Sequence, residues 1–166
     1  QRVGMPYVVG RWLGGTLTNY PVIAKLIQKY RGLIRSRDTG ELAQKYTKHE
    51  QSEMTREIAR LEDAVGGISD LTKLPDAIFI VYVRNEATAV REAARCKIVT
   101  FGICDTNVDP TPITYPIPGN DDAVASLRLL ITAFADAVEA GTMERAKAMA
   151  SAAVTPAPEA KPVEAA

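Results

Sequence analysis

Asp105, Asn107 and Asp109 stand at alternate positions, as the first three oxygen ligands of a calcium-binding loop do. The rest of such a loop does not match, because Pro110 replaces the required glycine and Pro116 replaces the bidentate glutamate. We therefore interpret these polar side chains as groups that stabilise a turn at the end of a strand.

Other residues with reactive or metal-binding side chains are few. Cys96, Cys104 and His49 cannot build the usual zinc site with four Cys or His ligands, and His49 has no Ser or Cys partner at a readable spacing. The glycines also fit neither of the two phosphate-binding fingerprints of nucleotide enzymes. We expect a protein that is not an enzyme and that uses no cofactor and no metal.

One alternative stays open at the predicted sheet. If residues 77–83 and 97–104 are parallel strands, then Asp105, Asn107 and Asn120 gather at the carboxyl edge of the sheet. Such edges bind ligands in open α/β folds. The sequence therefore permits an α/β domain that binds a small ligand of the phosphosugar type.

Positive charge is concentrated in the amino-terminal part of the chain. Residues 1–37 contain seven Lys or Arg side chains, and the first carboxylate is Asp38. Residues 1–74 carry a net charge of +4 and the remainder −4, although the whole chain sums to zero. A polyanion requires such local charge, because each cation placed on a phosphate releases counterions. A solvated helix face, compensated by acids from the other half, explains the same pattern.

The periodicity of apolar residues predicts that much of this positive charge lies on a helix. Apolar residues at spacings of three and four form one stripe, comprising Tyr20, Ile23, Ile27, Tyr30 and Ile34. A second stripe with the same spacings comprises Met54, Ile58, Leu61 and Val65. Because the polar residues 36–46 separate two such narrow seams, we predict an antiparallel coiled-coil hairpin that protrudes as an arm.

The remaining segments predict an α/β fold. A short apolar run at residues 5–10 and the nearly continuous run at 77–83 are typical of strands, the latter buried on both faces of a parallel sheet. A helix over 86–95, a strand over 97–104 and an edge strand with prolines at 115–118 follow. A last helix over 120–140 begins at Asn120 and has a predicted buried stripe comprising Val124, Leu127, Ile131, Phe134 and Val138.

Length and composition agree with a single domain. The chain has 166 residues, 46% of them hydrophobic, and its longest apolar stretch is far too short for a membrane helix. We expect one α/β domain over residues 1–141, with the arm inserted at 16–66, and a disordered tail rich in Ala, Pro and Glu over 142–166. We also expect a cytoplasmic protein with no membrane partner.

Several blocks carry a resemblance to a known family. They are the run from Arg11 to Asn19 (RWLGGTLTN), Gly66-Gly67-Ile68, Leu74 to Ala77 (LPDA), Asp105-Thr106-Asn107 and Ile117 to Ala123 (IPGNDDA). In this order the chain resembles the bacterial small-subunit (30S) ribosomal protein number two family over about residues 4 to 141. The resemblance implies a three-layer sandwich of the flavodoxin-like or Rossmann-like type on a parallel sheet, with a coiled-coil hairpin. It also implies a further amino-terminal βα portion, which is missing here.

The resemblance also implies a structural role in translation. The expected partners are 16S ribosomal RNA and neighbouring ribosomal proteins, including ribosomal protein number one, and no DNA. Together with the local positive charge, it makes the turn and the first helix of the arm the candidate RNA-binding site. The candidate residues are Arg11, Trp12, Gly14, Gly15, Thr16, Thr18, Asn19, Lys25, Lys29, Arg31 and Arg35.

Overall fold

The computed structural model describes residues 2–154 and contains a parallel sheet of three strands. The strands β1 (Ala77–Ile80), β2 (Val99–Cys104) and β3 (Tyr115–Pro118) lie in that order, so β2 is central. The register pairs Phe79 with Phe101 and Phe101 with Tyr115. Helix α4 (Ala87–Cys96) connects β1 to β2 and completes the predicted βαβ unit, which confirms the α/β class.

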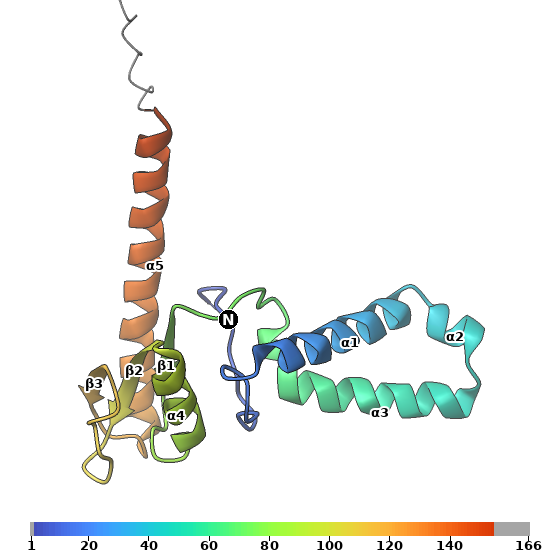
Figure 1. Ribbon diagram of the computed structural model, residues 1–166, viewed down its shortest axis with the longest axis horizontal. Coiled ribbons are helices and arrows are strands. Elements are labelled where there is room, and N and C mark those ends of the chain that lie inside the picture. The colour runs from blue at the N-terminus through green and yellow to red at the C-terminus, as the bar shows by residue number, and fades with distance from the viewer. Residues whose placement is uncertain (1, 155–166) are drawn as a thin grey trace, which may run out of the picture.

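Different helices cover the two faces of the sheet. Ile80 of β1 belongs to a buried cluster with Ala89 and Val90 of α4. Neighbouring Phe79 points to the opposite face, where its ring stacks on Phe134 of α5 (Val124–Val154) with centroids 4.1 Å apart. Phe101 meets the same Phe134 ring edge-on at 5.5 Å. The sheet therefore lies between α4 and α5 (Figure 1).

A pair of helices projects from the sheet. Helices α1 (Tyr20–Asp38) and α3 (Lys48–Val65) run side by side in opposite directions, with α2 (Glu41–Lys45) at the far end (Figure 1). The two apolar stripes meet in one cluster, in which Ile27 and Ile58 are each 3% exposed. The expected polar separator contains α2, because Leu42 packs into this same cluster. We call residues 20–65 the arm.

The last helix of the arm, α3, has a well-defined start. Thr47 and Glu50 form a capping box at the beginning of α3, with the Thr47 N–H donating to the Glu50 carboxylate at 2.8 Å. This exchange satisfies backbone donors that no helical carbonyl can reach. The position of α3 is therefore specified locally as well as by its apolar stripe.

The predicted strand over residues 5–10 is wrong. Its backbone lies against the short helix η1 (Gly66–Ile68), where the Tyr7 N–H donates to the Gly67 carbonyl at 2.9 Å. A Cβ on Gly67 would lie 2.2 Å from the Tyr7 carbonyl oxygen, so this close approach requires glycine. An apolar run predicts burial but does not supply a partner strand. The strand predicted over 77–83 also ends early, at Ile80, because the Tyr82 carbonyl is engaged in the turn that starts α4.

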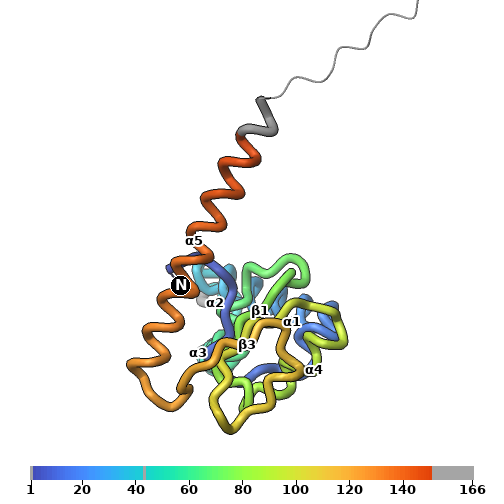
Figure 2. Tube along the Cα trace, turned by 90° about the vertical axis from the view of Figure 1, so that its left-hand side faces the viewer, coloured from blue at the N-terminus to red at the C-terminus, as the bar shows by residue number. Residues whose placement is uncertain are grey.

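Helix α5 is longer than expected. It continues past Gly141 to Val154 and projects away from the sheet (Figure 2), because the Ala-rich segment after Gly141 strongly favours helix. Residues 142–154 therefore do not belong to a disordered tail, and the rest of the predicted tail, 155–166, lies outside the described residues. Among residues 2–154, no helix is both long and apolar enough to cross a membrane.

The buried stripe predicted for α5 is only partly correct. Leu127 is buried and Phe134 packs on the sheet, but Val124 and Ile131 are 69% and 41% exposed. The helix is covered on one narrow face, where Phe134 contacts Phe79 of β1 and Phe101 of β2. Arg2 binds the exposed side of α5 through hydrogen bonds to Asp136 and Glu139.

Gly32 offers a test of the arm's helical stability. It is exposed within α1, and a Cβ added there would meet no heavy atom within 4 Å. We expect G32A to raise the free energy of unfolding by about 0.5–1 kcal/mol, measured by urea denaturation, because Gly disfavours helix relative to Ala. G40A is the matched control and should destabilise the protein, since Gly40 has a φ of +73°. A less stable G32A would contradict this prediction.

Candidate nucleic-acid interface

The chain enters α1 through a tight turn, residues 11–19, which we call the entry turn. The Thr16 N–H donates to the Leu13 carbonyl at 3.1 Å, and the Asn19 N–H donates to the Gly15 carbonyl at 2.8 Å. Gly15 has a φ of +92°, in the left-handed region that favours glycine. Asn19 is the N-cap residue of α1, so the turn leads directly into the arm.

The Glu92 carboxylate of α4 holds the entry turn. Glu92 is only 7% exposed, and its Oε1 accepts a hydrogen bond from the Gly15 N–H at 2.7 Å. Its Oε2 accepts from the N–H groups of Leu17 at 2.9 Å and Thr18 at 3.3 Å. Burial alone raises the pKa of Glu92, but these backbone donors outweigh it and hold the pKa below its ordinary value. The carboxylate is therefore a charged partner of the turn.

Trp12 and Thr16, both predicted to bind RNA, face the protein interior. Trp12 is half-buried and packs against the apolar cluster beneath α4, and its indole N–H lies 3.4 Å from Glu92 Oε1. Thr16 is 4% exposed, and its hydroxyl donates to the Leu13 carbonyl at 2.6 Å. Both side chains thus stabilise the entry turn, and their contact with RNA stays a prediction.

Glu92 is not among the residues predicted from the sequence. A usable signal was present, because Glu92 lies among Ala89, Val90 and Ala93 on the buried face of an amphipathic helix. A carboxylate on such a face requires hydrogen-bond donors to compensate its burial. The glycines and small polar residues of the entry turn could have been recognised as the segment that supplies them.

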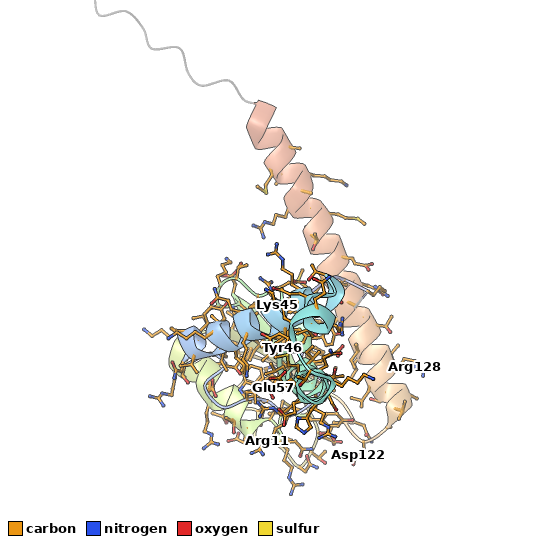
Figure 3. All side chains as sticks on the ribbon, turned by 90° about the vertical axis from the view of Figure 1, so that its right-hand side faces the viewer. Arg11, Lys45, Tyr46, Glu57, Asp122 and Arg128 are labelled. Atoms are coloured by element: carbon orange, nitrogen blue, oxygen red, sulfur yellow. The ribbon has the colours of Figure 1, made fainter. Side chains whose placement is uncertain are left out.

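The other candidate residues of the entry turn remain at the surface. Arg11, Gly14, Thr18 and Asn19 are exposed, and an added Cβ at Gly14 would meet no heavy atom within 4 Å. Figure 3, which views the molecule from the end of the arm, shows Arg11 and Lys45 on opposite sides of the helix pair. The backbone N–H groups of Gly15 and Thr18 are engaged by Glu92, so they are not available to a ligand.

The cations of α1 fall into two groups. Lys29 pairs with Glu57 of α3 at 2.7 Å, and Arg31 pairs with Asp70 at 3.1 Å. Arg60 and Lys29 together lower the pKa of Glu57 to about 2 through their hydrogen bonds. Lys25 and Arg35, in contrast, are exposed and form no ion pair within the part of the chain that the structure describes. Neither side chain would have to break an ion pair to bind a partner.

The unpaired cations share the outer side of α1. Lys25, Gln28, Gly32 and Arg35 follow at spacings of three, four and three, and all are exposed. This row lies opposite the buried stripe that contains Ile27. Ten residues of helix place the two cations about 15 Å apart along the axis. A negatively charged backbone lying along α1 could contact both.

The alternative site at the sheet edge consists mainly of turn contacts. Asp105 accepts hydrogen bonds from the N–H groups of Thr106 at 2.6 Å and Asp121 at 3.3 Å, which lower the pKa of Asp105. The Asn120 side chain accepts from the N–H groups of Asp122 and Ala123.

The other two candidate polar residues of this edge differ in their contacts. The Asp109 carboxylate accepts from the Thr111 N–H at 2.9 Å, whereas Asn107 is exposed. The interpretation of Asp105 and Asp109 as turn-stabilising residues is therefore confirmed.

Comparison with known proteins decides the family. The family model described as "Ribosomal protein S2" matches residues 1–141. The chain belongs to the ribosomal protein S2 family. It is 47% identical over 150 residues to the small ribosomal subunit protein uS2 of Acidothermus cellulolyticus, which covers 90% of this chain and 54% of that protein.

Two further S2 relatives give the same result. The uS2 protein of Corynebacterium jeikeium is 47% identical over 154 residues, covering 92% of this chain and 55% of the relative. That of Opitutus terrae is 45% identical over 141 residues, covering 85% and 46% respectively. This member of the S2 family therefore spans about half the length of the curated relatives it matches.

Proposed function

We propose that the chain is a structural constituent of the small ribosomal subunit that binds 16S ribosomal RNA. The observation that carries the proposal is the set of exposed cations without ion pairs, Arg11, Lys25 and Arg35, along the entry turn and α1. Cations without an ion-pair partner gain the most free energy on binding a phosphate, because no internal carboxylate must first be displaced. Membership of the S2 family supports the ribosomal location.

The proposed contacts position the protein and do not read bases. Arg11 and the α1 cations bind phosphates, and exposed Asn19 donates hydrogen bonds to the RNA backbone, whereas the Thr18 hydroxyl already donates to Glu92 Oε2 at 3.5 Å. Lys29 and Arg31 contribute less, since each already has a carboxylate partner. In this proposal the arm acts as a coiled-coil hairpin lying along an RNA helix, with no catalytic step.

The remaining partners follow from the family resemblance. We propose contacts with neighbouring ribosomal proteins, including ribosomal protein number one, and a cytoplasmic location on the ribosome. We also propose that residues 1–141 form the functional domain, and that the longer relatives add an amino-terminal βα portion to it. In the described residues β1 has a strand neighbour on one side only, which leaves room for that portion.

Co-sedimentation with small ribosomal subunits that lack their own S2 protein tests the proposal. We expect the chain to migrate with the subunits at low salt and to dissociate progressively as salt rises, because phosphate contacts dominate the affinity. Purified 16S RNA should bind similarly, and a DNA duplex more weakly. Failure to co-sediment at every salt concentration would exclude the proposed function.

A further inference from the structure

The contact between Glu92 and the entry turn joins the arm to the sheet. Two carboxylate oxygens receive donors from four residues: Trp12, Gly15, Leu17 and Thr18. A carboxylate has about four acceptor positions, so Glu92 is close to saturated. The turn therefore surrounds an internal anion, in the way that helix N-termini elsewhere surround a bound phosphate.

An apolar contact lies beside this polar one. Leu17 is 3% exposed and packs against Ala93 and Ile98. Ala93 is fully buried and follows Glu92 directly in α4. Since α1 begins at Tyr20, a displacement of Leu17 and Thr18 would be transmitted directly to the first turn of the arm. The contact with Glu92 therefore influences the orientation of α1 relative to the sheet.

We infer that Glu92 is a positioning residue for RNA binding, which fixes the entry turn and the start of α1 so that Arg11 and Lys25 face the RNA together. This inference rests on the proposed function. Glu92 itself touches no phosphate, because its carboxylate is buried and occupied by the turn. Its negative charge nevertheless increases RNA affinity, by raising the fraction of molecules whose arm is correctly oriented.

Two substitutions test this role in the full 166-residue chain, with purified 16S RNA as the probe. E92Q keeps the shape of the side chain but replaces one acceptor oxygen with an amide donor, and E92D keeps the charge but shortens the reach. We expect each to weaken RNA binding about tenfold, because N–H groups of the entry turn lose the charged acceptor that holds them in place. The slope of log affinity against log salt should not change, since the bound complex has the same phosphate contacts.

The sign of the E92Q effect is decisive. Removal of a negative charge near an RNA-binding surface should tighten binding if electrostatics alone matters. A positioning role for Glu92 predicts weaker binding instead. E86Q is the matched control, because Glu86 carries the same charge at the start of α4, and no donor to its side chain is found in residues 2–154. It should bind RNA as tightly as the unmodified chain, or slightly more tightly.

A measurement without RNA detects the same contact. Trp12 is the single tryptophan of the chain, and its indole N–H points to Glu92. We expect E92Q and E92D to shift the tryptophan emission spectrum while far-UV circular dichroism keeps its helical signal, and E86Q to leave the emission unchanged.

The outcomes separate this inference from the proposed function. If E92Q and E92D bind RNA as tightly as the unmodified chain, or more tightly, Glu92 is not a positioning residue. If E92Q does not fold, E92D alone decides by the same criterion. If the unmodified chain itself does not bind 16S RNA, the proposed function fails, while a shifted Trp12 emission would still establish the contact between Glu92 and the turn.

Discussion

The double variant I27D/I58D is expected to separate α1 from α3 while the sheet and its two covering helices remain folded. Both isoleucines are 3% exposed and belong to the central cluster of the arm. Burial of one carboxylate at such a position costs several kcal/mol in desolvation free energy. Two such costs together are about equal to the whole free energy of unfolding of a small domain. The expected result is a large loss of helical circular dichroism.

The emission of Trp12 provides the second measurement, because this side chain packs beneath α4 and outside the arm cluster. It should change little in I27D/I58D. A59D is the matched control, since Ala59 follows Ile58 on α3 but is exposed. Unchanged helicity in the double variant, or loss of the Trp12 environment together with the arm, would contradict the independence of arm and sheet.

The triple variant R11Q/K25Q/R35Q is expected to show the largest change in RNA affinity. Each lost phosphate contact reduces the salt slope by about 0.9, so three contacts reduce it by about 2.7. Extrapolated from 1 M salt, this corresponds at 0.1 M to a loss of about 2.7 orders of magnitude in affinity for 16S RNA. Because all three side chains are exposed, the fold should be unaffected.

A variant with the same change in net charge controls for nonspecific electrostatics. R128Q/R145Q/K147Q removes three exposed cations of α5 instead, and Figure 3 shows Arg128 on that helix, well away from Arg11. It should change affinity and salt slope only slightly. Equal effects of the two triple variants would mean that net charge, and not the surface along α1, controls binding.

Elements with strong local signals were predictable from the sequence. The stripes through Ile27 and Ile58 located both long helices of the arm, and the prolines of the segment 115–118 identified β3 as an edge strand. Periodicity works here because each helix buries a single face against one partner. The run at residues 5–10 failed because strand formation depends on a partner that local sequence does not specify.

The contacts within the candidate site were harder to predict from the sequence than the helices and strands. The separation of α1 cations into paired and unpaired groups depends on Glu57 and Asp70, which lie far along the chain from Lys29 and Arg31. The hydrogen bond between Glu92 and Gly15 also joins residues 77 positions apart. Periodicity and composition describe neighbours in sequence, so neither could assign these partners.

The two edges of the sheet differ in their capacity to accept another strand. Pro116 and Pro118 alternate along β3 with Tyr115 and Ile117, so the N–H groups of Tyr115 and Ile117 are those that can face β2. At the positions that point outward, proline has no N–H to offer. An approaching strand would find carbonyl acceptors without donors, which protects this edge from intermolecular pairing and aggregation. In the part of the chain that the structure describes, β1 contains no proline, so its edge is the one that could accept another strand.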